Sequence, residues 1–314
     1  MTPSQLSTAM TGSGSAAPRK PFVSSLLSYI DRRQSLFFPL PALVLVFSLA
    51  IYPIFYTLMI STRNYDLSLA RYTVVGLDNY VKVLSNQQFW LALMRSVVFS
   101  TLSVIISTSL GMAMALVLNR SFRGERWVRT AFLLPMVATP VATSLVWMMM
   151  FNPTLGILNY LLGLVGLPPS LWVADTNLVI LCVVLVDVWH SSPFAMIVLL
   201  AGLRSLPREP VESAMIDGAT RLQIFRLITL PMLKPVLVVV LIFRTIDSLK
   251  AFDIIWVITA GGPGTSSETL YVYAYNAAFK YLELGYGSAV IVVFAAIVAG
   301  ASVMLMRARS REWT

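Results

Sequence analysis

The chain has 314 residues, of which 57% are hydrophobic and only 12% are charged, and its formal net charge is +9. Soluble domains carry about 25% charged residues, so this composition, with a mean hydropathy of +0.78, excludes an ordinary soluble domain and indicates an integral membrane protein. The long continuous apolar runs also exclude a transmembrane barrel, whose strands alternate over about 10 residues.

Six apolar runs are long enough to cross a bilayer, since about 20 helical residues span a hydrocarbon core of roughly 30 Å. The fold class is therefore all-α integral membrane with six transmembrane helices, and both termini lie on one side. The first run lacks a clear cleavage site, so we interpret it as a retained span rather than a signal peptide. The predicted spans are residues 36–61, 89–118, 128–151, 178–203, 232–258 and 286–306.

These spans divide the chain into an N-terminal tail (1–35), a six-span domain (36–306) and a C-terminal tail (307–314). Lys and Arg concentrate on one side of this arrangement. Four lie in the N-terminal tail, four in or beside the loop 119–127, five in the segment 204–234 and three in the C-terminal tail, whereas the other side carries four.

Because cytoplasmic loops carry the excess of Lys and Arg, both termini are predicted to be cytoplasmic. Topology thus accounts for the net charge and leaves nothing for nucleic-acid binding to explain. The one cysteine excludes an intrachain disulfide and a cysteine-based metal cluster.

The fourth span carries a polar cluster near its centre. Asp187 and His190 are three residues apart, hence on adjoining helical positions, and Ser191 follows just before Pro193, where we expect the helix to loosen. Charges within the hydrocarbon region are costly and indicate function. His190 is the one histidine, so a metal site is not expected. A structural or cavity-lining role is favoured over a proton relay with Asp187.

A charged segment, residues 207–231, separates the fourth and fifth spans. Pro210 starts a short helix, and Glu212 lies in its first turn, where the helix dipole favours a carboxylate. Asp217 and Gly218 then break the chain, and Asp217 is predicted to be the N-cap of a second helix. We expect a helix, a turn and a helix along the cytoplasmic face; composition alone would also suit an ordinary amphipathic surface helix.

In the fifth span, charges alternate in sign at three-residue steps, so that each is the helical neighbour of the next. One interpretation is a structural ladder that neutralises itself, and the other is that part of it lines a translocation cavity. The charges are Arg244, Asp247, Lys250 and Asp253. The candidate substrate path comprises Asp187, His190, Ser191, Arg244, Asp247 and Lys250.

After the fifth span, consecutive glycines flank a proline and permit backbone turns that other residues resist. By the predicted topology this loop lies on the outer surface. Gly261, Gly262 and Pro263 are therefore candidate contacts for a partner protein on that surface, and an ordinary turn leaving the span is the alternative.

Six positions in the 207–231 segment resemble the EAA loop of the membrane subunits of bacterial ABC importers: Glu212, Ala214, Gly218, Ile228, Leu230 and Pro231. Ser213 replaces the first Ala of that motif, one small residue for another. Residues 155–172, 187–207 and 252–279 resemble segments of the carbohydrate branch, the relatives of the maltose and glycerol-phosphate permeases. The resemblance covers residues 36–306.

This resemblance implies the bundle of a type I ABC importer permease, a transport subunit rather than an enzyme, for a sugar, polyol or glycerol-phosphate-type solute. The EAA loop of the family is a coupling helix that docks on an ATP-hydrolysing subunit. The expected coupling residues are Glu212, Ala214, Asp217, Gly218, Ile228, Leu230 and Pro231.

The implied partners are a second homologous permease, two copies of an ATP-binding subunit, an extracytoplasmic solute-binding protein and the lipid of a bacterial cytoplasmic (inner) membrane. The sequence contains no G-x-x-x-x-G-K-S/T phosphate loop. ATP and Mg are therefore expected on the partner subunits, and no cofactor on this chain.

Two other function classes remain in view. A proton-coupled secondary transporter would use Asp187, His190 and the span-five charges as a relay. Such transporters usually have paired internal repeats, which are not evident here, and the coupling segment would go unexplained. An intramembrane enzyme would need a nucleophile constellation or metal-ligand spacing, and the sequence shows neither.

Overall fold

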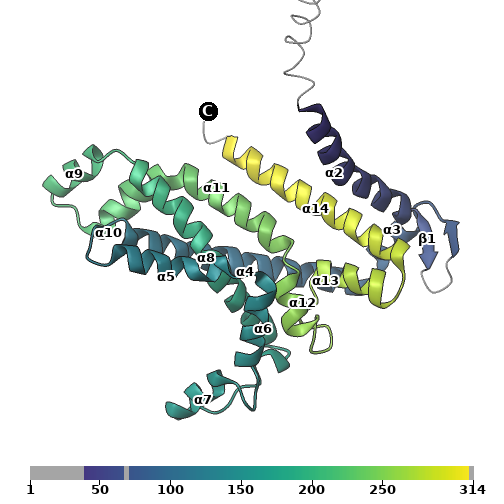
Figure 1. Ribbon diagram of the computed structural model, residues 1–314. Coiled ribbons are helices and arrows are strands. Elements are labelled where there is room, and N and C mark those ends of the chain that lie inside the picture. Colours follow the sequence, from purple (N-terminus) through teal and green to yellow (C-terminus); the bar gives the residue numbers. More distant parts are fainter. Residues whose placement is uncertain (1–38, 67–70, 311–314) are drawn as a thin grey trace, which may run out of the picture. The chain divides into compact units, whose positions relative to one another are not determined.

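The computed structural model describes residues 39–66 and 71–310. The predicted N-terminal tail lies outside the described residues, as do the last four residues of the predicted C-terminal tail. The chain forms two compact units, one ending at Tyr56 and the other beginning at Thr57. This boundary falls within a single helix, α2 (Leu40–Ser61) (Figure 1).

The described part of the first unit is the start of α2, and it is apolar on every side. Leu45, Phe47 and Leu49 are all at least 60% exposed, and the rings of Tyr52 and Tyr56 stack with centroids 5.9 Å apart. A helix that is apolar all round is suited to lipid or to another apolar protein surface rather than to water.

The second unit is helical apart from one short hairpin. Its two strands, β1 (Arg63–Asp66) and β2 (Arg71–Val74), pair antiparallel with Arg63 opposite Val74. The buried Asn79 amide donates to the carbonyl oxygens of Ser61 and Arg63, both at 2.9 Å. The predicted all-α fold therefore lacked this hairpin, which forms in the connection between α2 and α3.

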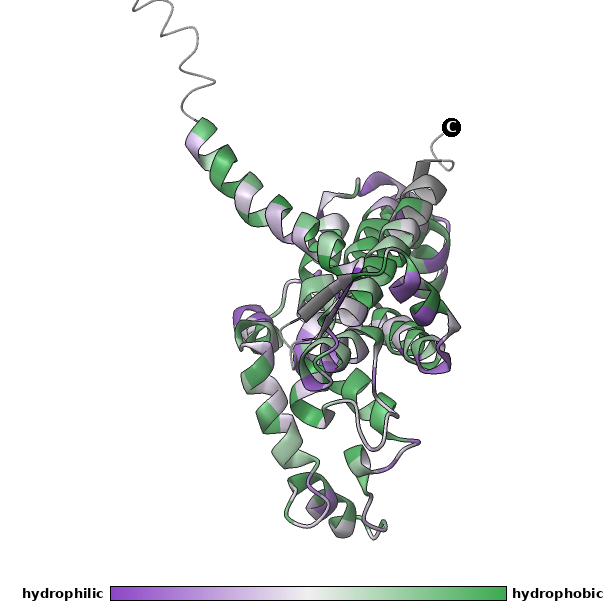
Figure 2. Ribbon diagram, turned by 90° about the vertical axis from the view of Figure 1, so that its right-hand side faces the viewer, coloured by the Kyte–Doolittle hydropathy of each residue, from purple (hydrophilic) through white to green (hydrophobic). Residues whose placement is uncertain are grey.

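The helices of the second unit follow in chain order, with apolar residues on most of their surfaces (Figure 2). They are α3 (Asp78–Ser85), α4 (Gln87–Leu118), α5 (Glu125–Val137), α6 (Pro140–Met150), α7 (Ile157–Leu164), η1 (Trp172–Ala174), α8 (Val179–Ser205), α9 (Glu209–Ile216), α10 (Arg221–Ile224), η2 (Phe225–Thr229), α11 (Leu230–Leu249), α12 (Asp253–Thr259), α13 (Leu270–Tyr275), η3 (Asn276–Lys280) and α14 (Leu284–Ser310).

Helix α4 runs through all three parts of the hydrophobic core. Its start, at Phe89, packs with α3, α13 and α14, and its middle, at Phe99, packs with α6, α8 and α12. Its end, at Leu118, packs with α5, α8 and α11. Helices α4, α8 and α11 lie side by side (Figure 1). The long second span is thus the element on which the other spans assemble.

Five helices of the described residues are long and apolar enough to cross a membrane, and a sixth span results if α5 and α6 count as one. The predicted third span, residues 128–151, is bent, because these two helices meet at 95°. Thr139 caps α6 through its hydroxyl, and Pro140 occupies its first turn. A proline there starts a new helix, since it cannot supply the N–H that a continuous helix needs.

The predicted fifth span is also interrupted. Helix α11 ends at Leu249 and α12 begins at Asp253, so residues 250–252 leave the helix. In the fourth span the opposite holds: α8 runs without a break through Pro193, and the expected loosening does not occur.

The closest approach of α4 to α8 is at Gly111. A Cβ atom placed there would lie 2.6 Å from Ala195 Cβ and 2.8 Å from the Met196 backbone nitrogen. Real side-chain contacts do not occur at such distances, so only glycine permits this packing.

We therefore expect Gly111→Val to push α4 and α8 apart and to lower the free energy of unfolding by about 1–3 kcal/mol, the usual cost of overpacking. The measurement is thermal unfolding of the purified chain in mild detergent. Gly163→Ala is the matched control, because a Cβ at this exposed helical glycine meets nothing within 4 Å. Equal melting of Gly111→Val and the parent would contradict the packing argument.

Candidate functional site

The 207–231 segment forms the predicted helix, turn and helix, with a different cap from the one expected. Asp217 is the C-cap of α9, not the N-cap of the next helix. Gly218 follows with φ +82°, the Ala219 N–H donates to the Ala214 carbonyl at 2.9 Å, and the Gly218 N–H donates to the Met215 carbonyl at 3.2 Å. This is a Schellman turn, which favours glycine at this position.

Thr220 is the actual N-cap of the second helix. Its hydroxyl accepts from the Gln223 N–H, and the Gln223 side chain accepts from the Thr220 N–H at 2.8 Å, a reciprocal capping box. Asp217 loses this role because the turn places two further residues before the helix starts.

The second helix does not stop before the fifth span. Helices α10, η2 and α11 form one helix over Arg221–Leu249, with a π-helical turn at Phe225–Thr229 directly before Pro231. Proline has no N–H to donate, and such turns absorb a local break in an α-helix. Ile228 lies in the π turn and Leu230 begins α11. The segment is thus joined rigidly to the fifth span.

Helix α9 itself projects from the second unit and contacts mainly the segment that follows it (Figure 1). None of its residues is buried, and Ile216 is 88% exposed. Glu212 and Ser213 are also exposed. An isolated helix of eight residues with apolar side chains in water is marginal, so a partner surface that covers α9 would stabilise it.

A buried ionic cluster joins the second, fourth and fifth spans. Arg244 on α11 is 1% exposed, and its guanidinium donates to Asp187 Oδ2 on α8 and to Asp247 Oδ2, both at 2.7 Å. On α4, Ser107 and Ser103 each accept from Arg244 at 3.2 Å, and Ser103 donates to Asp187. Three helices are therefore connected through one cation.

The two carboxylates beside Arg244 differ in their surroundings. The Asp187 side chain is 6% exposed, whereas the Asp247 side chain is 70% exposed. Burial of Asp187 is costly unless the charge is paired and hydrogen-bonded, so the pair with Arg244 is structural. Asp247 is a second carboxylate on the same guanidinium, and its side chain is largely exposed.

Two adjoining cavities, of about 380 Å³ and 260 Å³, open beside this cluster and share His190, Ser191 and Asp247. The first is also lined by Asp187, Lys250, Asp253 and Tyr271, and the second by Arg244, Phe194 and Phe243. The structure thus brings all six residues of the candidate substrate path to one place, although they come from two spans.

The predicted ladder in the fifth span is wrong beyond Asp247. Lys250 follows the last residue of α11, and Asp253 lies in the first turn of α12, so the four charges do not share one helix. Lys250 forms no ion pair with any residue that the structure describes. Lys250 and Asp253 both line the first cavity, and they do not form an ion pair along one helix.

His190 makes no hydrogen bond to Asp187 among the described contacts, and its Nδ1 is buried without a partner there. A direct proton relay between these two side chains therefore has no contact to support it. Among the described residues, no group of three His, Cys, Asp or Glu side chains lies close enough to hold a metal ion.

The glycine-rich loop after α12 turns as its composition predicts. Gly261 and Gly264 have φ +94° and +59°, and Ser267 Oγ donates to the Gly262 carbonyl at 2.7 Å. Gly261 is buried, and a Cβ there would lie 3.3 Å from Glu268 Cβ. Gly262 and Pro263 are partly exposed, so they form the accessible part of this candidate contact.

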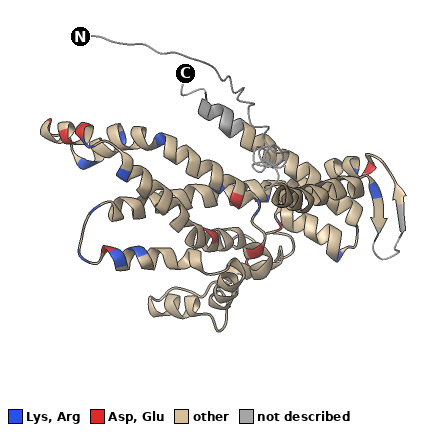
Figure 3. Cartoon of the chain, turned by 45° about the horizontal axis from the view of Figure 1, so that its top comes forward, with Lys and Arg blue, Asp and Glu red and all other residues tan. Residues whose placement is uncertain are grey.

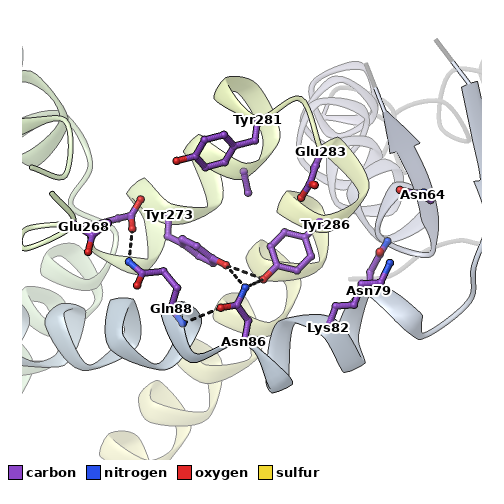
Figure 4. Close-up of a pocket in the computed structure, with 12 residues that line it drawn as sticks. Asn64, Asn79, Lys82, Asn86, Gln88, Glu268, Tyr273, Tyr281, Glu283 and Tyr286 are labelled. Carbon is purple, nitrogen blue, oxygen red and sulfur yellow. Dashed lines mark hydrogen bonds between the residues drawn. The ribbon is translucent and has the colours of Figure 1, made fainter. Parts of the chain in front are cut away.

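A polar cavity of about 470 Å³, the outer cavity, lies next to this loop (Figure 4). Asn86 donates to the hydroxyls of Tyr273 and Tyr286, both at 3.2 Å, and these hydroxyls lie 2.8 Å apart. Glu268 is 5% exposed and accepts from Gln88 at 2.9 Å and from Asn276 at 2.7 Å.

Burial raises the pKa of Tyr273 above its ordinary value, and the hydrogen bond with Tyr286 raises it further. This tyrosine therefore stays a neutral hydroxyl at physiological pH. Both donors to Glu268 are neutral amides, and no cation lies within ion-pair distance of it in the described part of the chain. The outer cavity is lined by two carboxylates, Glu268 and Glu283, and one cation, Lys82.

The sequence interpretation missed the residues of the outer cavity and two serines of the ionic cluster. The outer-cavity residues come from β1, α3, α4, α13, η3, α14 and the segments that connect them, and nothing in a single sequence brings these elements together. The serines carried a signal: Ser96, Ser100, Ser103 and Ser107 recur at helical spacing on one face of α4, and all four are buried.

Comparison with known proteins agrees with this geometry. Residues 107–311 match a family model described as "Binding-protein-dependent transport system inner membrane component". A "Trehalose/maltose transport system permease protein MalF" from Thermococcus litoralis is 35% identical and is aligned over 91% of this chain and 96% of that one.

Among solved structures, a bacterial ABC transporter involved in the import of the acidic polysaccharide alginate superposes with a TM-score of 0.79 at 22% identity. The superposition covers 91% of this chain and 99% of that chain. A second alginate transporter structure, in complex with alginate pentasaccharide-bound periplasmic protein, gives a TM-score of 0.76 at 22% identity, with 89% and 95% covered. Both show the same fold.

The two carboxylates of the ionic cluster allow a matched test. We expect Asp187→Asn to destabilise the purified protein by about 3 kcal/mol or more, because it leaves the buried Arg244 without its buried partner. Asp247→Asn changes an exposed partner of the same arginine and should cost about 1 kcal/mol or less. Thermal unfolding in detergent compares the two. Equal losses would mean that the cluster does not depend on burial.

Proposed function

The chain belongs to the family of binding-protein-dependent transport system inner membrane components, and from this premise we propose how it works as a permease subunit of an ATP-driven sugar importer. One observation carries the proposal. The exposed helix α9 precedes a single rigid helix, Arg221–Leu249, whose far end holds Arg244 and Asp247 at the cavity. A displacement at α9 therefore reaches the cavity over about 35 Å of helix.

The partner subunits supply the energy in this proposal. Two copies of an ATP-binding subunit bind ATP and Mg, since this chain has no phosphate loop. A cleft on each ATPase covers one coupling helix, and a second homologous permease presents the other. Exposed side chains of α9, Met215 (59%) and Ile216 (88%), are the apolar anchors for this contact.

We place both termini and α9 on the cytoplasmic side of the inner membrane. The argument is the distribution of charge: Lys and Arg gather on α5, α10 and the segments next to α9 and α10, whereas α9 itself carries two glutamates (Figure 3), and cytoplasmic loops carry this excess of Lys and Arg. The glycine-rich loop and the outer cavity then face outward.

In this orientation an extracytoplasmic binding protein docks over the glycine-rich loop. Gly262 and Pro263 offer an accessible turn, and the neighbouring outer cavity offers hydrogen-bonding side chains such as Gln88 and Tyr286. The alginate transporter of similar fold is in complex with a periplasmic protein, which supports the same kind of partner here.

We propose an uncharged saccharide as the solute. The two cavities beside the ionic cluster are lined by three carboxylates (Asp187, Asp247 and Asp253) and two Lys or Arg side chains (Arg244 and Lys250), an excess of one negative charge among these side chains. This charge repels a phosphate, while hydroxyl, imidazole and aromatic groups suit a sugar. The similarity to a trehalose/maltose permease supports a neutral disaccharide over a glycerol phosphate.

Alternating access follows from these parts. ATP binding closes the ATPase pair and draws the coupling helices together, the two permeases rock, and the cavity opens toward the loaded binding protein. Hydrolysis reverses the movement. The permease makes and breaks no covalent bond.

The coupling assignment predicts that Glu212→Lys abolishes transport while the protein still inserts and assembles. A reversed charge in a docked interface costs more than about tenfold in affinity. The measurement is solute-stimulated ATPase activity and uptake of the reconstituted importer. Glu209→Lys is the control: it changes the same charge in the first turn of the same helix, outside the coupling residues. Normal uptake by Glu212→Lys would overturn the assignment.

The solute assignment is tested with trehalose and glycerol 3-phosphate as probes. We expect the reconstituted importer to take up trehalose. Lys250→Gln should change the KM for trehalose by no more than about fivefold, because an exposed cation contributes at most about 1 kcal/mol to a neutral ligand. A phosphate solute would lose at least about tenfold with its counter-charge. Uptake of glycerol 3-phosphate instead would overturn the neutral solute and leave the permease function intact.

A further inference from the structure

A cleft of about 640 Å³ lies between the end of α4 and the coupling segment. One wall comes from Leu116 and Arg120 at the end of α4, with Leu203 near the end of α8. The other comes from Arg221, Leu222 and Phe225 on the helix that continues into the fifth span. The mechanism above uses one of the residues that line it, Met215, and none of the others.

The charge of the cleft is uncompensated. Arg120 and Arg221 line it from positions about a hundred residues apart, no carboxylate lines it, and neither arginine has an ion-pair partner among the residues that the structure describes. Other arginines nearby are paired: Glu125 lies 2.8 Å from Arg204 and 3.7 Å from Arg129.

The position of Arg221 adds to this excess. It is the first residue of a 29-residue helix, where the helix dipole already favours a negative charge. A cation there is unfavourable by itself. An anion held between Arg120 and Arg221 would offset both the helix dipole and the repulsion between the arginines.

Apart from the two arginines and the polar Asn119 and Thr229, the residues that line the cleft are apolar. An apolar surface lies beside the two cations, formed by Leu116, Leu203, Leu222 and Phe225. A free anion would make no favourable contact with this apolar surface. A phospholipid would contact both parts of the cleft, because its phosphate can bind the arginines and its acyl chains can pack against the leucines. Arginine suits this role, because its planar guanidinium binds phosphate oxygens in pairs.

We propose that the cleft binds an anionic phospholipid of the cytoplasmic leaflet, with its phosphate between Arg120 and Arg221 and an acyl chain along Leu116 and Leu203. This rests on the proposed function, which puts the ends of α4 and α8 at the cytoplasmic surface. Basic pockets between transmembrane helices at this depth hold lipid headgroups. The lipid ties the coupling segment to the span bundle and so sets how easily the segment moves.

The test uses the complete importer, purified in mild detergent and exposed to phosphatidylglycerol, with bound lipid counted by native mass spectrometry. We expect Arg120→Gln and Arg221→Gln each to weaken phosphatidylglycerol binding about fivefold, the effect of roughly one basic residue at a lipid surface. The matched control is Arg123→Gln, which removes an exposed arginine from the same connection outside the cleft. An equal loss in the control, or none in the two variants, overturns the site.

Two further experiments test whether inorganic phosphate or a protein subunit occupies the cleft instead of the lipid. Displacement of phosphatidylglycerol by inorganic phosphate would indicate a free-anion site and overturn the lipid. A photo-crosslinker at Leu222 that captures the ATPase subunit instead of lipid would show that protein covers the cleft. The proposed function has its own readout, since Glu212→Lys should stop transport and leave lipid binding unchanged. Failure of one proposal is thereby distinguishable from failure of the other.

Discussion

The pairing of Arg244 with Asp187 is the constraint on which the rest of the bundle depends. A guanidinium that is 1% exposed has no water to solvate it, so its position is fixed by the groups that can accept its hydrogen bonds. Those groups lie on α4 and α8, so their hydrogen bonds to Arg244 fix the positions of α4, α8 and α11 relative to one another. The two cavities lie beside this ionic cluster, and its exposed residue, Asp247, lines both of them.

A second constraint links this cluster to the coupling segment. Because α10, η2 and α11 form one helix, the chain has no joint between the residues after the Schellman turn and Arg244. Helix α9 joins this helix through the Schellman turn at Gly218, whose two backbone hydrogen bonds connect the turn to the end of α9. The proposed coupling depends on this continuity, since a break within the helix would absorb the movement before it reached the cavity.

Much of the candidate site could be predicted because its signals are local. The helix, turn and helix of the coupling segment follow from Pro210, Glu212 and Gly218, whose preferences act within one turn of backbone. The cap was assigned to the wrong residue, since Asp217 and Thr220 are both good caps and the Schellman turn decides between them. The broken third and fifth spans were missed because hydropathy averages over windows longer than a bend.

The sequence by itself determined that this is a membrane-embedded helical protein, approximately where its apolar spans lie, and that residues 207–231 form a helix, a turn and a helix, because composition, hydrophobic runs and turn residues act over short distances. Only the tertiary structure decided which charges are paired and which face a cavity. Asp187 and Asp247 are 60 positions apart and alike in a sequence, but packing of α4 against α8 buries one and exposes the other. Burial depends on contacts between distant segments, and so it belongs to the fold.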